Sequence, residues 1–318
     1  VGTGAGVQPY VESSAHARAR LDATAAQVIE QCPRTQLGLA GFSQGAAVVS
    51  GFAQDVGAGQ GPVPADRVAG VALLSDPTRP AGGEPIPGRP GQVSPDAAPG
   101  TDPVATSRVR LDPVPFSGGI ADTGTDFAAL EGRVGEFCAA HDLACDAPAN
   151  AAALQVVAGV AAQADLRDPI VAAGSLVGAW QATVGEAVDE VMLSDVRVEG
   201  GQVNYVPSET VSQRLAEAAD PGAGSPGPEH GVAAADKTGA VVAAIVADPV
   251  GQIPRLVGQI GAAIGAELAA NADLLNPATW VHYATTVASH TGYGASGQAA
   301  DAGQWLAALS QDVSGASR

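Results

Sequence analysis

Residues 41–45 read Gly-Phe-Ser-Gln-Gly, and this stretch decides how the chain on either side of it is expected to fold. Residues 35–40, just before it, are short and apolar, which is typical of a buried strand. Residues 46–53, just after it, predict a helix that starts at once. A strand, a G-x-S-x-G turn and a helix make a nucleophile elbow, whose glycines are needed because the two backbones pass close together. We therefore expect Ser43 to be a nucleophile, with the backbone N–H of Gln44 directed at a developing oxyanion.

The composition limits the class of protein. The 318 residues allow one large or two ordinary domains, and 46% of them are hydrophobic, as expected for a globular chain with a buried core. The formal net charge of −18 argues strongly against a nucleic-acid partner, which needs a basic patch, and suits a highly soluble, secreted protein. Apolar runs stay shorter than the roughly 18 residues of a membrane span, so we expect no transmembrane segment.

The chain has three cysteines. Cys138 and Cys145 are close together in a loop-like stretch, which suits a local disulfide. Cys32 is then left over. It is either a buried free thiol or the partner of a cysteine in a missing or separate segment before Val1, which is not a natural first residue.

Helical and apolar extended patterns alternate in the first half of the chain. We expect a helix over residues 13–30, a second buried strand over 68–74, an isolated strand at 109–111, and a short helix followed by a strand between 126 and 137. A closing helix is expected over residues 298–309. This alternation predicts an α/β fold with a parallel sheet that is covered on both faces.

The composition changes near Asn150 and again near Pro277. Between these points the chain is rich in Ala, Val and Gly at helical spacing, interrupted by a polar patch at residues 195–205. We therefore predict a helical insertion, or cap, over residues 151–276. A catalytic domain would be formed by residues 1–150 and 277–318.

A serine nucleophile needs a histidine base, and that base needs a carboxylate to fix its tautomer. His290 is the preferred base because it lies in a Ser-, Thr- and Gly-containing loop before the last helix. His282 is the alternative, although it lies in an apolar, helical stretch where a packed histidine is the commoner explanation. For the acid we favour Asp142, whose loop a disulfide would hold in place. The alternative is Asp76 at the end of the second strand.

Three parts of the chain resemble the cutinase family of serine esterases. The segment Cys32-Pro33-x-Thr35 and the elbow after it resemble the family's C-P-x-T strand and G-[YF]-S-Q-G-A turn. Residues 138–145, Cys-Ala-Ala-His-Asp-Leu-Ala-Cys, resemble its C-x3-D-x2-C loop. His-Thr-Gly-Tyr at 290–293, with the helix after it, resembles its H-x-x-Y segment. The likeness covers about residues 7–150 and 277–310.

The resemblance implies a three-layer α/β-hydrolase sandwich in which Ser43, Asp142 and His290 form the catalytic triad. It implies hydrolysis of carboxylic esters through an acyl-enzyme, with no metal and no cofactor. The apolar insertion suggests a lipidic acyl group. Because actinobacterial members of the family include lipases and hydrolases of trehalose mycolates, an envelope lipid or mycolate is the expected substrate, and the cell envelope or its exterior is the expected location.

Two features depart from the family pattern. The family places its histidine a short loop after its acid, whereas the insertion at 151–276 intervenes here. The family also begins with a strand whose R-G-[ST] motif supplies a second oxyanion donor; Thr3 resembles that residue but lies too close to Ser43 in the sequence. Two other functions stay open: an acyltransferase that uses the same triad, and a non-catalytic envelope interaction protein in which the insertion is the functional part.

Overall fold

The computed structural model describes residues 9–121, 125–163, 165, 169–220 and 226–316. These residues form two compact units. The main parts of unit 1 are Tyr10–Ala149 and Ala278–Arg318, and the main part of unit 2 is Asn150–Pro277.

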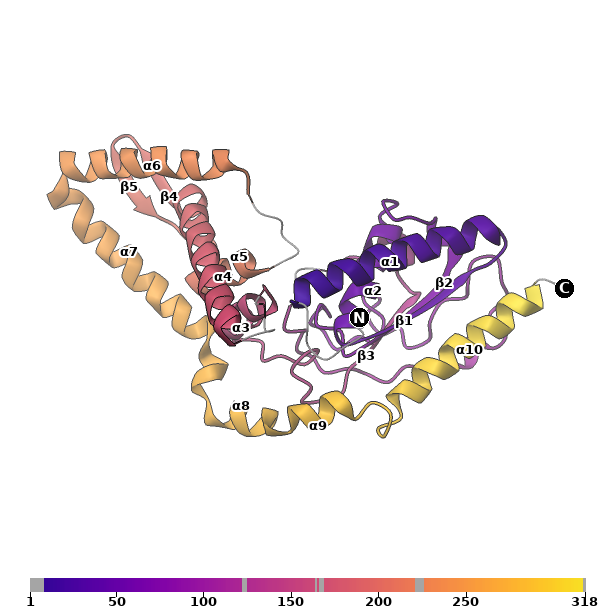
Figure 1. Cartoon of the computed structure of the whole chain (residues 1–318). Coiled ribbons are helices and arrows are strands. Elements are labelled where there is room, and N and C mark those ends of the chain that lie inside the picture. The colour runs from indigo at the N-terminus through magenta and orange to yellow at the C-terminus, as the bar shows by residue number, and fades with distance from the viewer. Residues whose placement is uncertain (1–8, 122–124, 164, 166–168, 221–225, 317–318) are drawn as a thin grey trace. The chain divides into compact units, whose positions relative to one another are not determined.

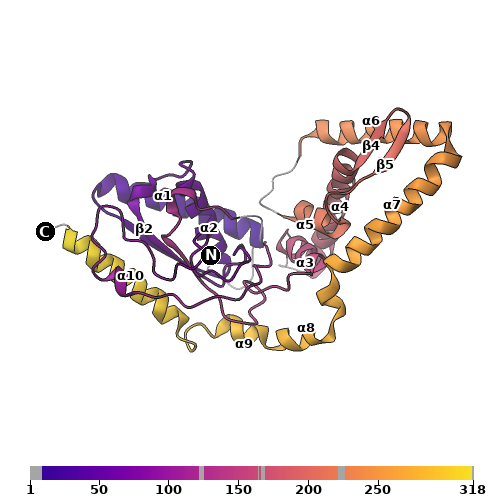
Figure 2. The same cartoon turned by 180° about the vertical axis from the view of Figure 1, so that it is seen from behind.

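Unit 1 is built on a parallel sheet with the strand order β1-β2-β3 among the described residues. Helices α1 and α2 pack on one face of this sheet and α10 packs on the other, as both views show (Figure 1, Figure 2). The predicted α/β fold with a parallel sheet covered on both faces is therefore confirmed. The elements are β1 (Leu37–Phe42), β2 (Val68–Leu74), β3 (Val134–Phe137), α1 (Tyr10–Gln31), α2 (Gln44–Gly57), α8 (Pro277–His282), α9 (Thr286–Thr291) and α10 (Gln298–Ala316).

The strand β2 is buried along its whole length, which explains its unbroken apolar sequence. On one side of the sheet, Phe52 and Val56 of α2 fill the core. On the other side Trp305 of α10 is fully buried against the strands. A Cβ atom on Gly135 would lie only 2.7 Å from the Trp305 ring, so this strand position needs a glycine for α10 to pack closely.

The long segment between β2 and β3 differs from the prediction at residues 109–111. No strand forms there in the part of the chain that the structure describes. The Arg110 guanidinium donates to the carbonyls of Ser107 and Val109, and the Leu111 N–H donates to the Val93 carbonyl at 2.8 Å, so this segment makes its hydrogen bonds within the long loop. The predicted helix-then-strand between 126 and 137 is present as a 3₁₀ turn, Ala128–Leu130, followed by β3.

Unit 2 contains five α-helices and a two-stranded antiparallel hairpin among its described residues. The polar patch at 195–205 forms this hairpin because Gly200 and Gly201 both take positive φ, +57° and +75°, as a tight two-residue turn requires. The elements are α3 (Ala152–Gln163), α4 (Pro169–Glu190), β4 (Val196–Glu199), β5 (Gln202–Tyr205), α5 (Val211–Ala219), α6 (Pro228–Ala247) and α7 (Pro249–Ala270).

By length and composition alone, one helix of the described residues, α6, could cross a membrane. A single helix of this kind is weak evidence, since helices inside globular domains pass the same test. Lys237, near the middle of α6, donates to the carbonyl of Leu193 at 2.7 Å and so joins this helix to the rest of unit 2.

Cys32 is free and exposed in the described part of the chain. The interpretation of Cys32 as a buried thiol is therefore wrong. Its pairing with a cysteine of another segment stays a prediction.

Candidate active site

The elbow places Ser43 between the end of β1 and the start of α2. Its backbone has φ 54° and ψ −123°, a conformation that is costly for a residue with a side chain. The turn is tight: a Cβ atom on Gly41 would lie 2.4 Å from the carbonyl oxygen of Gly45. The Ser43 N–H donates to the carbonyl of Leu74 at 2.9 Å, which fixes the elbow to the end of β2. The predicted strand and helix thus present Ser43 at the carboxyl edge of the sheet.

Gln44 opens helix α2. The hydrogen-bonded turn of the helix starts with the Ala46 N–H, which donates to the Ser43 carbonyl at 2.8 Å. The N–H of Gln44 lies in the first turn before that point, where helix N–H groups have no intrahelical acceptor. The Gln44 side chain donates to Tyr10 O and Ser14 Oγ at 2.9 and 3.0 Å, so α1 holds the elbow in place.

Asp142 and His290 meet directly. His290 Nδ1 lies 2.9 Å from Asp142 Oδ1. The Asp142 side chain is 1% exposed and the His290 side chain 30%, so the carboxylate is enclosed while the imidazole reaches the surface. A second donor to Asp142 Oδ1 is the Ala144 N–H at 3.1 Å. A buried carboxylate that orients a more exposed imidazole is the arrangement that a catalytic base requires.

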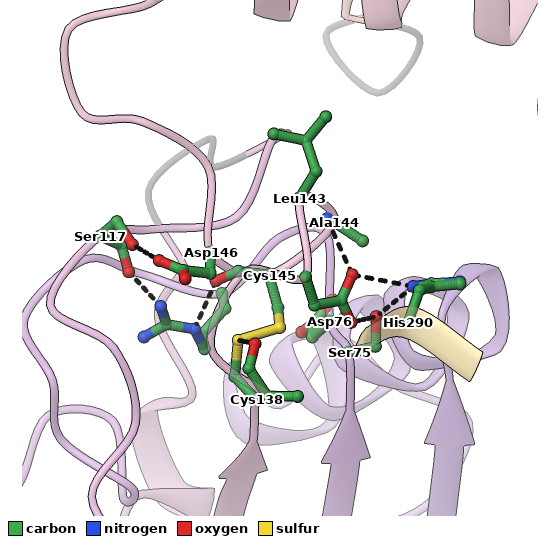
Figure 3. The surroundings of a disulfide bond; sticks show 12 residues. Ser75, Asp76, Ser117, Cys138, Leu143, Ala144, Cys145, Asp146 and His290 are labelled. Atoms are coloured by element: carbon green, nitrogen blue, oxygen red, sulfur yellow. Dashed lines mark hydrogen bonds and ion pairs between the residues drawn. A yellow bond between two sulfur atoms is a disulfide. The ribbon is translucent and has the colours of Figure 1, made fainter. Parts of the chain in front are cut away.

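A disulfide closes the acid loop. Cys138 follows β3 directly and is bonded to Cys145, as the sequence predicted. The Arg79 guanidinium also holds the loop, since its Nε donates to the Cys145 carbonyl at 2.9 Å and its Nη2 to the Ser117 carbonyl. Figure 3 shows the disulfide beside the ends of the strands, with His290 and Ser75 next to the loop. These bonds give the Asp142 carboxylate one fixed position.

His290 lies in the last turn of the short helix α9, not in a loop as predicted. The prediction failed because the threonines of this segment have tertiary partners: Thr286 Oγ1 accepts the Leu143 N–H of the acid loop at 2.9 Å. The alternative base, His282, contacts His141 instead, with their ring centroids 3.9 Å apart.

Ser43 lies beside this pair without a direct bond to it. Among the described residues no hydrogen bond joins the Ser43 hydroxyl to His290. The ring of Phe42, the residue before the serine, lies 5.2 Å from the His290 ring and 5.4 Å from the Tyr293 ring. The structure therefore brings two of the three predicted residues together and puts the serine at the same edge of the sheet. Catalytic hydrogen bonds are often formed only once substrate is bound.

Two hydroxyl groups complete the surroundings of Asp142, and sequence reasoning gave neither a role. Ser75 Oγ donates to Asp142 Oδ2 at 2.6 Å and lies 3.0 Å from His290 Nδ1. The Tyr293 hydroxyl donates to the same Oδ2 at 2.8 Å and accepts the Ala139 N–H at 3.0 Å. Burial and the charge of Asp142 raise the pKa of Tyr293, so this hydroxyl keeps its proton at all ordinary pH values. The H-x-x-Y pattern pointed to Tyr293; for Ser75 the signal was its place directly after a buried parallel strand.

The alternative acid, Asp76, has a different set of partners. Its Oδ1 accepts the Thr78 N–H at 2.9 Å and the Thr78 hydroxyl at 2.8 Å. Burial raises the pKa of Asp76. It also lies near Glu136 of β3, whose pKa is raised well above its usual range by burial and by the charge of Asp76. Neither oxygen of Glu136 has a hydrogen-bond partner among the described residues.

Two remaining predictions concern groups outside these contacts. Thr3, compared above with an oxyanion residue, lies outside the described residues. The described part of the chain contains no group of three or more His, Cys, Asp or Glu side chains arranged to hold a metal ion.

Comparison with known proteins gives the family of this chain. Residues 1–164 match the family model named Cutinase. The chain is 32% identical over 142 residues to the carboxylesterase Culp6 homolog of Corynebacterium glutamicum. That alignment covers 44% of this chain and 45% of the relative, so the chain spans less than half the length of the curated relative that it matches. Since the family model covers more than half of the 318 residues, and the elbow and disulfide loop lie within it, the chain belongs to the cutinase family.

Proposed function

We propose that this protein is a serine carboxylic-ester hydrolase with Ser43 as nucleophile, His290 as base and Asp142 as the acid that orients the base. The observation that carries the proposal is the 2.9 Å contact between His290 Nδ1 and the buried Asp142, at the sheet edge where the elbow presents Ser43. Membership of the cutinase family and the name of the carboxylesterase relative support it.

The mechanism follows from the positions of these groups. His290 Nε2 takes the proton of Ser43 Oγ as this oxygen attacks the ester carbonyl, and the Asp142 carboxylate stabilises the imidazolium through Nδ1–H. The N–H of Gln44 donates to the oxyanion of the tetrahedral intermediate. The imidazolium then gives its proton to the departing alkoxide. In the second half of the reaction His290 deprotonates a water molecule, which hydrolyses the acyl-enzyme and releases the acid.

We further propose that the ester is lipidic. Unit 2 contains a groove of about 520 Å³ between the hairpin, α6 and α7. Its walls are mainly aliphatic and include Val203, Val241, Leu256, Ile260 and Ala263. A groove of this size and lining suits an apolar ligand. Its presence supports a substrate with a long acyl chain, as in an envelope lipid or mycolate. Because such a substrate lies in the cell envelope, we propose that the protein works there or outside the cell.

The test is hydrolysis of p-nitrophenyl esters from short to long acyl chain by the wild type and by Ser43→Ala. The control is Ser107→Ala, which changes an exposed serine in the same unit. We expect Ser43→Ala to lose about 10⁴-fold or more in kcat, as removal of a triad serine does in other enzymes, and the control to keep full activity.

The two other functions give different outcomes in the same assay. An acyltransferase would hydrolyse these esters slowly and would form acylated sugar when trehalose is added. A non-catalytic protein would leave wild type and Ser43→Ala equally inactive, and that result would contradict the proposed function.

A further inference from the structure

Ser75 occupies a backbone position that favours glycine. It follows the last residue of β2 directly and has φ 54°, in the left-handed region where a side chain is strained. Ser75 is also fully buried, with 0% of its surface exposed. Glycine would fit this turn with less strain, so the serine side chain brings something that glycine does not.

The Ser75 hydroxyl connects the proposed acid to the proposed base. Its single proton goes to Asp142 Oδ2, the shortest of the contacts to this carboxylate at 2.6 Å. Its lone pair then faces His290 Nδ1 at 3.0 Å. Because Asp142 Oδ1 lies 2.9 Å from the same nitrogen, a proton on Nδ1 has two acceptors, the carboxylate and the hydroxyl.

We infer that Ser75 is a positioning residue for the catalytic histidine. By donating to Asp142, the hydroxyl is oriented so that its oxygen accepts from Nδ1–H of His290. This second acceptor holds the proton on Nδ1 and leaves the lone pair on Nε2, the tautomer that can take a proton from Ser43. It also fixes the rotation of the imidazole ring. The inference rests on the proposed function, because it assigns Ser75 a part in the same reaction.

Tyr293 provides a comparison within the same site. Its hydroxyl donates to the same Oδ2 of Asp142, at 2.8 Å, and its own acceptor role is taken by the Ala139 N–H. Among the described residues its hydroxyl makes no hydrogen bond to His290. Both hydroxyls therefore donate a hydrogen bond to the Asp142 carboxylate, but only the Ser75 hydroxyl also contacts the His290 imidazole.

The decisive variant is Ser75→Gly, which removes the hydroxyl and relieves the backbone strain at once. We expect it to be at least as stable as the wild type in urea unfolding, and to lose tenfold or more in kcat with little change in KM. If Ser75 served the fold alone, kcat would not fall in a variant that is as stable as the wild type. Ala128→Gly is the matched control, since it relieves a positive φ of 44° at an exposed residue of the same unit. We expect the control to keep its kcat.

A second measurement is independent of activity. Proton NMR of the Ser43→Ala protein is expected to show a downfield His290 Nδ1–H signal that is slow to exchange. Adding Ser75→Gly should shift this signal and speed its exchange, whereas adding Tyr293→Phe should leave it in slow exchange.

The outcomes separate the two proposals. If the wild type hydrolyses no ester, the proposed function fails, and the NMR comparison still decides the role of Ser75. If Ser75→Gly keeps wild-type kcat, or leaves the Nδ1–H signal unchanged, the inference is overturned.

Discussion

The geometry of the candidate site depends on the hydrogen bonds that one residue, Asp142, accepts. Its carboxylate accepts from His290 Nδ1, from the Ser75 and Tyr293 hydroxyls and from the Ala144 N–H. A carboxylate that is removed from water needs such partners, because an unpaired buried charge is strongly destabilising. The four donors satisfy this carboxylate and hold it in place, so removing a donor should affect the reaction.

Removing the Tyr293 hydroxyl tests this account at residue scale. Tyr293→Phe takes one donor from the carboxylate and leaves the Ala139 N–H without its acceptor, so we expect unit 1 to lose roughly 2 kcal/mol of stability. We expect kcat to fall by several-fold with KM nearly unchanged. Urea unfolding and steady-state hydrolysis measure the two effects. Tyr283→Phe, whose ring packs against His282 in the same unit, is the control, and equal effects of the two variants would contradict the assigned contact.

The sequence could predict Ser43, Asp142 and His290 because each lies in a short pattern with its own chemistry. The contacts of Ser75 could not be predicted from the sequence, since they join residues that are far apart in the chain and that only the folded sheet brings together. The helical state of His290 was missed for the same reason. Its segment is rich in Ser and Thr, which usually indicates a loop, but Thr286 is bonded to the acid loop.

At the scale of elements, the disulfide loop after β3 carries the acid, and this predicts an effect of the disulfide on both stability and rate. Replacing Cys138 and Cys145 together by Ala should cost unit 1 about 2 kcal/mol, as expected for a loop of this length. It should also lower kcat more than it changes KM, because Asp142 is then less firmly held. The free thiol offers a matched control: Cys32→Ala should change neither quantity. A double variant with full stability and kcat would contradict this role of the loop.

The strand β3 carries a second acid, Glu136, which should make the stability of unit 1 depend on pH. The folded state raises the pKa of Glu136, so the folded protein keeps a proton that the unfolded chain releases near its ordinary pKa of about 4.3. Stability from this group is therefore lost as pH rises above that value. Glu136→Gln cannot ionise, so we expect it to be more stable than the wild type at pH 8 by roughly 1 kcal/mol or more, and about equal at pH 4.

Urea unfolding between pH 4 and 8, followed by the fluorescence of buried Trp305 with Trp180 and Trp280 replaced by Phe, reports on unit 1. Glu30→Gln, at an exposed position of α1, is the control and should follow the wild-type pH dependence. A Glu136→Gln variant that is destabilised at pH 8 would show that the carboxylate is needed ionised, against this account.

At the scale of the whole molecule, the α/β pattern of the first half and the helical character of the insertion could be predicted, because both depend on the spacing of apolar residues. The hairpin of unit 2 could not be predicted, since its strands are short and their polar residues indicate only an interruption of the helices. The groove beside this hairpin depends on side chains from several elements, so no local pattern could reveal it.

The groove leads to a prediction about substrate choice. Ala263 lines it, and Ala263→Phe should fill part of its volume. We expect this variant to bind a long-chain fatty acid more weakly than the wild type, as measured by displacement of a fluorescent lipid probe. The matched control is Ala262→Phe, which adds the same side chain to the neighbouring exposed position of α7 outside the groove. Equal affinities of the two variants for the fatty acid would contradict the assignment of this groove as a lipid-binding site.

The most direct test of the central claim is to label the protein with a fluorophosphonate and locate the adduct by mass spectrometry. The account predicts a single adduct, on the peptide that contains Ser43, and much slower labelling of His290→Ala, in which the base is absent. An adduct on another serine, or no adduct on a folded wild-type protein, would contradict the assignment of Ser43, His290 and Asp142 as a working triad.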